Sequence, residues 1–299
     1  MRRDLRTLAA AVALFIGMAT TGAALAQKPG GVLKVYFFDS PASMSIHEEP
    51  TISTVVPMMG VFNNLVMFNQ DVVQNSLQSI VPDLASEWSW DEDKTQLTFR
   101  LREGVKWHDG KPFSAKDVQC TWDLLTGKSG ERLRIKAWYR NLDKVTTHGD
   151  YEVTFQLKRT QPAFIALLAS GFSPIYPCHV SPRDMRTNPI GTGPFKFVEF
   201  KPNESIKLVR NPDYWRPDRP YLDGIEYTII KNMSTAMLTF VSGKLDITFG
   251  GLTVPLTRDL TNQSPQAICE LNPTNVSRNL IITPMRRRST TRICVGRWR

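Results

Sequence analysis

The strongest constraint on the fold is an alternation of apolar and polar residues over Thr95–Gly104 (TQLTFRLREG). Leu97, Phe99 and Leu101 fall on one side of an extended chain, which predicts a strand with one buried face. Gly104 is predicted to end this strand. A half-buried strand needs partner strands and a second layer to cover its apolar face, so the chain must contain a sheet with elements packed on it.

The same alternation recurs on both sides of a turn at residues 143–157 (DKVTTHGDYEVTFQL). Gly149 and Asp150 are typical turn residues, so this segment is predicted to be a β-hairpin. The inner face of its second strand would consist of Tyr151, Val153, Phe155 and Leu157. Further strands are predicted at 30–38, in a hairpin at 195–211, at 224–231 and from Leu245 onward.

Helices are predicted between these strands. Ser114 and Asp117 have the spacing of a capping box at a helix start, and Gly127 is predicted to end that helix. Its apolar stripe consists of Val118, Trp122 and Leu125. Two more helices are predicted at 162–170 and 234–243. The fold class is therefore expected to be α/β.

The net charge of +9 is concentrated near the ends of the chain. The last fifteen residues contain six arginines and no acid, which supply +6, and the first 26 residues supply +2. This leaves about +1 for residues 27–284, so the body lacks the strong positive charge that is typical of polyanion-binding domains. We expect no nucleic-acid partner for the body.

Residues 1–26 have the three parts of a secretory signal peptide. A short basic region is followed by an apolar core at residues 8–19, and Ala24–Ala26 offers small residues at a cleavage site. The apolar core is shorter than the roughly 20 residues that span a bilayer, which argues against the alternative of an uncleaved anchor. We predict cleavage after Ala26 and export to the periplasm.

The cysteines and histidines show no metal-binding spacing. Cys120, Cys178, Cys269 and Cys294 are widely separated, with neither a zinc nor a dithiol pattern. An oxidising compartment would allow one disulfide among them, but the sequence leaves the pair open. The histidines are scattered in the same way, so we predict no metal site and no cofactor.

Two short motifs could be mistaken for catalytic elements. Trp107–Gly110 (WHDG) places a histidine beside an acid, but adjacent residues on a turn point apart, so we interpret Asp109-Gly110 as a turn. Gly191–Pro194 (GTGP) lacks the lysine of a phosphate-binding loop and leads into a strand, so we interpret it as a tight backbone crossing. No G-x-S-x-G elbow supplies a nucleophile. These patterns favour a binding protein over an enzyme, and no catalytic residue is predicted.

Three long blocks in order resemble one family, the extracellular solute-binding proteins of family 5, which are dipeptide, oligopeptide and nickel receptors of ABC importers. The blocks are residues 80–118 (IVPDLASEWSW…AKDV), 190–215 (IGTGPFKF…NPDYW) and 220–250 (PYLDGIEYTIIK…DITFG). The resemblance extends over residues 30–283.

The resemblance implies a periplasmic binding protein-like clamshell (type II, three-domain cluster), in which two lobes close around a ligand. Residues 27–60 and 175–275 would form the main part of the first lobe, with residues 61–174 as an inserted subdomain. Residues 276–284 would cross toward a second lobe, which is missing from the sequence.

The resemblance also implies the function. The chain would be a monomeric periplasmic receptor that delivers a peptide or a related small solute to an ABC permease at the inner membrane, and not an enzyme. The seven tryptophans and seven tyrosines could stack on a ligand, but the individual ligand contacts stay unassigned. Two alternatives remain open, namely an exported hydrolase and a polyanion binder that uses the C-terminal arginines.

Residues 285–299 (MRRRSTTRICVGRWR) do not resemble the family. One codon choice for this segment, read two bases later, gives APPFDDPDLRRALA, which is the continuation expected of the family. We therefore interpret 285–299 as a frameshifted, disordered tail without a selected role. With the second lobe absent, we predict weak or no ligand capture, and tight binding by residues 27–299 in calorimetry would contradict this.

Overall fold

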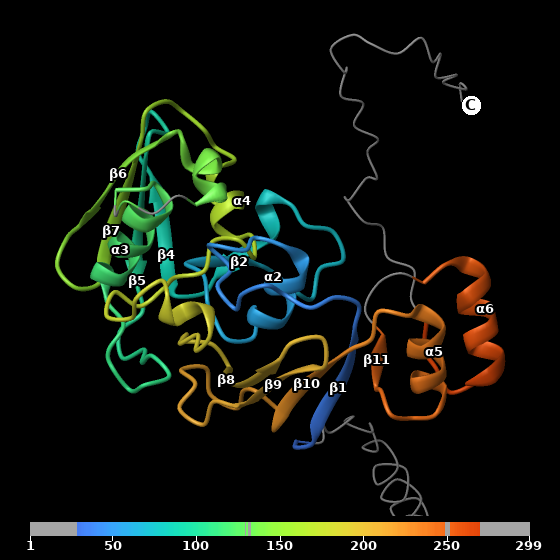
Figure 1. The fold of residues 1–299 in the computed structure, drawn as a ribbon. Coiled ribbons are helices and arrows are strands. Elements are labelled where there is room, and N and C mark those ends of the chain that lie inside the picture. Colours follow the sequence, from blue (N-terminus) through green and yellow to red (C-terminus); the bar gives the residue numbers. More distant parts are fainter. Residues whose placement is uncertain (1–28, 129, 131–132, 249–251, 270–299) are drawn as a thin grey trace, which may run out of the picture. The chain divides into compact units, whose positions relative to one another are not determined.

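The computed structural model describes residues 29–128, 130, 133–248 and 252–269 (Figure 1). The predicted signal peptide at 1–26, the crossover at 276–284, the basic tail at 285–299 and Cys294 all lie outside the described residues. The chain divides into two units, Met1–Ala267 and Ile268–Arg299, and the sheets and pockets below belong to the first unit.

One sheet has five strands in the order β11-β1-β10-β9-β8 (Figure 1). These strands are β1 (Val32–Phe37), β8 (Phe195–Lys201), β9 (Ser205–Arg210), β10 (Gly224–Ile229) and β11 (Ile247–Thr248). β1 runs parallel to both β10 and β11, whereas β8, β9 and β10 are antiparallel neighbours. The predicted hairpin at 195–211 is confirmed, and the Glu204 N–H closes its turn by donating to the Lys201 carbonyl at 3.0 Å.

The second large sheet has four antiparallel strands in the order β4-β5-β7-β6. They are β4 (Ala85–Trp90), β5 (Gln96–Leu101), β6 (Leu142–Thr147) and β7 (Glu152–Leu157). The buried face predicted for residues 95–104 is confirmed, because Leu97, Phe99 and Leu101 on β5 are all buried. Val153, Phe155 and Leu157 on β7 are buried as well, while Tyr151 is half-buried.

Helix α3 (Ala115–Leu125) packs against β6 and β7 and covers the buried face of this sheet. The Asp117 carboxylate accepts the Ser114 N–H at 3.0 Å, as the capping-box spacing predicts. Gly127 follows the helix with a φ of +77°, a conformation that favours glycine.

Shorter elements complete the region around this sheet. β2 (Val66–Phe68) and β3 (Ile80–Pro82) form a two-stranded sheet, with η1 (Leu77–Ser79) before β3. The other short elements are α2 (Ile52–Met58), η2 (Arg134–Tyr139), α4 (Phe164–Leu168) and η3 (Asp184–Arg186). α4 is shorter than the predicted 162–170: residues 162–163 form a turn before it, and the Ser170 hydroxyl donates to the Leu167 carbonyl at 2.6 Å where it ends.

Helices α5 (Met233–Val241) and α6 (Val254–Gln263) pack on the five-stranded sheet at β1. Tyr36 of β1 is buried in one cluster with Ala236 and Met237 of α5 and Leu260 of α6. β11 begins at Ile247, two residues after the predicted start at Leu245, because bends at residues 244 and 246 precede it.

The buried residues form two large clusters. The first contains residues from Leu65 to Ile175 around the four-stranded sheet. The second contains residues of 35–62 and of 176–229, together with Leu124 of α3, around the five-stranded sheet. The domain limits 27–60, 61–174 and 175–275 stay a prediction.

A disulfide joins Cys120 of α3 to Cys178, with 5.7 Å between their Cα atoms. This settles the pairing that the sequence left open. Cys269 is a free, exposed cysteine.

Gly191 and Gly193 lie directly against the backbone of Val61. The Gly193 N–H donates to the Val61 carbonyl at 2.9 Å, and a Cβ at Gly191 would overlap that carbonyl oxygen. The interpretation of residues 191–194 as a tight backbone crossing is therefore confirmed. Glycine is needed at this crossing because the two chains are too close for a side chain between them.

We predict that Gly191→Ala lowers the free energy of unfolding by about 2–3 kcal/mol, because the backbone must move to admit the methyl group. Gly60→Ala is the matched control, since a Cβ there would meet side-chain atoms of Phe195 and Leu208 at ordinary distances of 3.4 and 3.5 Å. Urea unfolding followed by circular dichroism measures both changes. Equal unfolding midpoints for the two variants would contradict the prediction.

Candidate functional site

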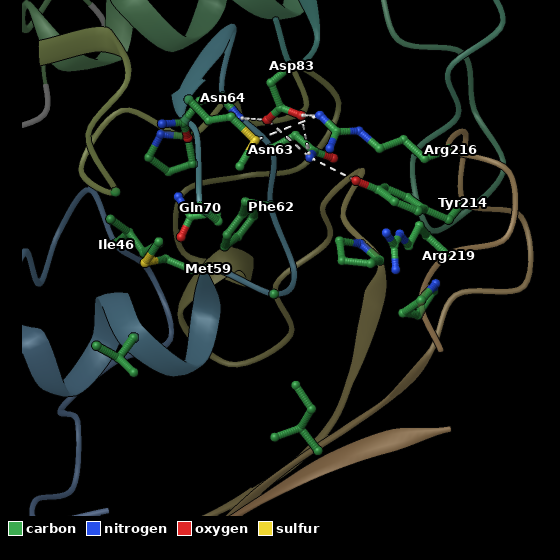
Figure 2. A pocket seen from close by; sticks show the side chains of 18 of the residues that line it. Ile46, Met59, Phe62, Asn63, Asn64, Gln70, Asp83, Tyr214, Arg216 and Arg219 are labelled. Carbon is green, nitrogen blue, oxygen red and sulfur yellow. Dashed lines mark hydrogen bonds and ion pairs between the residues drawn. The ribbon is translucent and has the colours of Figure 1, made fainter. Parts of the chain in front are cut away.

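A pocket of about 520 Å³ lies between α2, β10 and the loops around Asp83 and Arg216 (Figure 2). Ligand sites in proteins commonly have volumes of about 300–1,000 Å³. The apolar part of the lining includes Ile46, Val56, Met59, Phe62, Ile225 and Tyr227. The remainder carries a polar network, and Figure 2 shows as dashed lines its hydrogen bonds among the residues that line the pocket.

The polar network is centred on Asp83, which is buried between β3 and β4. Its Oδ1 accepts from Arg216 Nη2 at 3.1 Å and from Asn63 Nδ2 at 3.0 Å. Its Oδ2 accepts from the Asn64 N–H, also at 3.0 Å. Both carboxylate oxygens therefore have strong donors, as a buried charge requires.

Asn63 connects this carboxylate to two distant segments. Its Nδ2 also donates to the Tyr214 hydroxyl at 3.3 Å. Its Oδ1 accepts from Thr192 Oγ1 at 3.1 Å and from Trp215 Nε1 at 3.3 Å. The network thereby joins the loop after α2, the crossing at Gly191–Pro194 and the segment after β9.

Two arginines flank the Trp215 ring. The guanidinium carbons of Arg102 and Arg216 lie 4.9 and 4.7 Å from the ring centroid, which is the geometry of cation–π contacts. Arg102 Nε also donates to the Asp83 backbone carbonyl at 2.7 Å. Arg102, Arg216 and Asp83 give this cluster a net charge of +1.

Burial raises the pKa of Asp83, and the Arg216 guanidinium together with the Asn64 and Asn63 donors opposes that rise. Because the carboxylate and the Asn63 amide are occupied by protein groups, little of their hydrogen-bonding capacity remains for a ligand. We interpret the network as structural, because it holds together the segments that form this wall of the pocket.

Next to the pocket, helix α2 presents an exposed apolar face. Ile52, Val56 and Met59 have the i, i+4, i+7 spacing of one helical face, and Ile52 and Met59 are 52% and 49% exposed. A Cβ built at Gly171 would lie 3.1 Å from the Met59 sulfur, so the surface continues into the segment after α4.

Trp138 of η2 lies against the same segment after α4. It makes an edge-to-face contact with Phe172, with the ring centroids 5.1 Å apart, and it is 46% exposed. Exposed tryptophan and aliphatic side chains are typical of surfaces that bind a ligand or a partner. We name the residues Ile52, Val56, Met59, Trp138 and Phe172 the aromatic ridge.

Most of the chain matches one known protein family. Residues 79–280 match the model of the bacterial extracellular solute-binding proteins, family 5 (middle region). The chain belongs to this family. The resemblance stated from the three sequence blocks is confirmed.

The curated relatives of this chain support its assignment to family 5. A putative ABC transporter peptide-binding protein of Brucella ovis is 29% identical over 262 residues, which cover 83% of this chain and 47% of the relative. The oligopeptide-binding protein AppA of Bacillus subtilis is 38% identical over 159 residues, which cover 49% of this chain and 28% of AppA. In the longer of these two matches, the chain spans about half the length of its curated relative.

Solved structures of family 5 members share the fold. The periplasmic binding protein DppA from Helicobacter pylori, in complex with the peptide STSA, matches with a TM-score of 0.72 and 26% identity over 81% of this chain and 50% of DppA. MoaA from A. tumefaciens R10, in complex with mannopinic acid, matches with a TM-score of 0.71 and 27% identity over 80% of this chain and 48% of MoaA. The predicted α/β, periplasmic binding protein-like fold is confirmed.

Within the first family 5 block, the turn interpretation of Trp107–Gly110 is also confirmed. The Gly110 N–H donates to the Trp107 carbonyl at 2.8 Å, and Gly110 has a φ of +86°. The His108 ring reaches the crossing, with its Nε2 3.0 Å from the Gly193 carbonyl and its Nδ1 accepting the Gly191 N–H at 3.3 Å. His108 thus connects the first and second family 5 blocks, which no local pattern in the sequence indicates.

His47 is a second buried histidine that the sequence did not distinguish. Its ring stacks on Tyr176 with the centroids 3.9 Å apart, and Tyr176 stacks on Phe62 at 4.9 Å. Burial lowers the pKa of His47 to about 3, which the backbone carbonyl of Pro174 offsets only in part. Because the His47 ring is buried against aromatic side chains, we interpret it as part of the core and not as a catalytic base or a metal ligand.

Two further features are absent from the described part of the chain. Among those residues, no three or more histidine, cysteine or acidic side chains are grouped as metal ligands would be. The same residues include no helix with the length and apolarity needed to cross a membrane.

Proposed function

We propose that this chain forms part of an exported receptor that binds a peptide or a related small solute and passes it to the permease of an ABC importer. Its membership in family 5 supports this proposal, as do relatives that are named peptide-binding proteins of ABC transporters. The signal peptide with cleavage after Ala26, the periplasmic location and the monomeric state belong to the same proposal. Of the two crystallised neighbours above, one holds the peptide STSA and the other holds mannopinic acid, so the proposal covers both peptides and other small solutes.

The observation that carries the proposal for this chain is the aromatic ridge beside the pocket. Three of its side chains are about half exposed, although each could contribute about 1.5–3 kcal/mol if fully buried. A solute that lies along α2 would cover Ile52, Val56 and Met59, and one that continues over residues 171–172 would reach Trp138. We propose this ridge as the surface against which the solute binds.

We predict that Trp138→Ala weakens peptide binding at least 10-fold, because a large aromatic contact at the centre of an interface contributes much of the binding free energy. The measurement is a titration of the chain with tetrapeptides that carry apolar, basic or acidic side chains, followed by chemical-shift changes or calorimetry. Val198→Ala, which removes a 56% exposed side chain on β8, is the control.

Two results would contradict the proposal. One is unchanged affinity in Trp138→Ala, and the other is an equal loss in Val198→Ala. Circular dichroism of each variant verifies that the fold is retained.

A further inference from the structure

The disulfide between Cys120 and Cys178 attaches one wall of the pocket to helix α3. Beside the disulfide, the Tyr176 N–H donates to Thr121 Oγ1 at 2.9 Å, and the Cys178 N–H donates to Asp117 Oδ1, also at 2.9 Å. The backbone of residues 176–178 is thus held to α3 by one covalent bond and a few hydrogen bonds.

The side chain of Tyr176 contacts a residue of the pocket lining. It stacks between His47 and Phe62, and its hydroxyl lies 3.4 Å from Ser45 Oγ. Phe62 lines the pocket directly, as does Pro174, two residues before Tyr176. A displacement of residues 176–178 would therefore be transmitted through the Tyr176 ring to the pocket wall.

The disulfide is placed where a small dithiol can reach it. Cys120 and Cys178 are both half-buried, and both line a hollow of about 230 Å³ that is separate from the pocket. The remainder of that hollow is mostly apolar and includes Leu124, Pro177 and Val180.

We propose that the Cys120–Cys178 disulfide acts as a redox latch for the solute site: when oxidised it holds residues 176–178 in place, and when reduced it lets them move. This proposal rests on the function proposed above. A thiolate of a dithiol attacks one sulfur of the bond, forms a mixed disulfide and releases the other cysteine as a thiolate. The second thiol of the reductant then attacks the mixed disulfide. This step yields two protein thiols and a cyclic oxidised reductant, with two electrons passed to the protein and protons taken up by its thiolates.

Reduction changes what holds the pocket wall. The bond closes a loop across 58 residues of sequence, and without it residues 176–178 are held to α3 by hydrogen bonds alone. The hydrogen bonds that remain each stabilise the contact only modestly. The reduced protein keeps its two cores, while Tyr176 leaves its stacked position more often.

The test uses the full chain with Cys269→Ser and Cys294→Ser, so that only the disulfide reacts with thiols. The protein is treated with dithiothreitol without denaturant, alkylated, and analysed by mass spectrometry for labels at Cys120 and Cys178. Amide exchange is then compared between oxidised and reduced protein. We expect at least 10-fold faster exchange at the Tyr176 and Cys178 amides, with little change in β5 and β7.

Ligand binding is the second readout. The tetrapeptide that the oxidised chain binds most tightly should bind the reduced chain at least 3-fold more weakly. Cys120→Ser/Cys178→Ser reproduces the reduced state and should not respond to dithiothreitol.

Each outcome is decisive. The proposal is overturned if dithiothreitol leaves the bond intact, if exchange at residues 174–178 does not change, or if circular dichroism shows that reduction unfolds the whole chain. If neither form binds any peptide, the aromatic ridge fails as the proposed solute surface of this chain, whereas faster exchange confined to residues 174–178 still supports a latch on the pocket wall.

Discussion

Asp83→Ala lowers the free energy of unfolding by about 2–3 kcal/mol, because it removes a buried carboxylate that accepts hydrogen bonds from Asn63, Asn64 and the partly exposed Arg216. The variant leaves Arg216 without its carboxylate, and it leaves the Asn64 N–H and one Asn63 amide contact without an acceptor. Unpaired buried donors carry the full cost of their lost hydration. Chemical denaturation of the variant and the wild type, analysed with a common slope, gives the difference.

Glu87→Ala provides the comparison for Asp83→Ala. Glu87 pairs with Arg100 at 3.5 Å, but both side chains are about two-thirds exposed, so its loss should change the stability by less than about 1 kcal/mol. Asp83→Asn keeps the shape of the side chain and should retain part of the stability. If Glu87→Ala lowered the free energy of unfolding as much as Asp83→Ala, the Asp83 network would contribute no more to stability than an exposed ion pair.

Acidification from pH 7 to pH 4.5 lowers the free energy of unfolding by about 5 kcal/mol through two histidines. Burial lowers the pKa of His47 to about 3, and burial also lowers the pKa of His108 to about 4. The unfolded chain takes up protons near pH 6.5, while the folded chain excludes them until the pH approaches these lower values. The contribution of these two histidines to stability is therefore fully present above pH 6.5. It declines as the pH falls to 4.5, by about 2–3 kcal/mol for each histidine.

The His47→Phe variant isolates half of this effect. A phenyl ring can keep the stack on Tyr176 but cannot take up a proton, so the variant should recover about 2.5 kcal/mol at pH 4.5 and change little at pH 8. Comparing the variant with the wild type at each pH cancels the titration of shared carboxylates. His148→Gln, at a histidine that bonds to Thr154 on the exposed hairpin, is the control. A constant difference between His47→Phe and wild type across this range would disprove the mechanism.

The sequence was most informative where the determining interactions are local. The buried face of Leu97, Phe99 and Leu101 follows from side-chain alternation, and the start of α3 follows from the Ser114–Asp117 spacing. Hairpin turns at 149–150 and 201–204 depend on residues that are next to each other in the chain. Such features need no knowledge of distant segments.

The candidate site depends on contacts that local patterns do not encode. Asn63 meets Thr192 and Trp215 across 129 and 152 residues, and the pairing of Cys120 with Cys178 required the relative placement of two elements. The aromatic ridge was equally hidden, because Trp138 and the buried Trp122 look alike in the sequence. Only the packing of each region decides which tryptophan faces solvent.

The position of β1 between β10 and β11 also determines the order in which the chain can fold. Val32 pairs with Gly224, so the first strand has no sheet partner until nearly 200 further residues have been made. The strands β4 to β7 and helix α3 lie within 85–157 and can assemble earlier on contacts of shorter range. We expect residues 32–37, with their apolar Val35, Tyr36 and Phe37, to be the segment that most needs protection from aggregation before the five-stranded sheet forms.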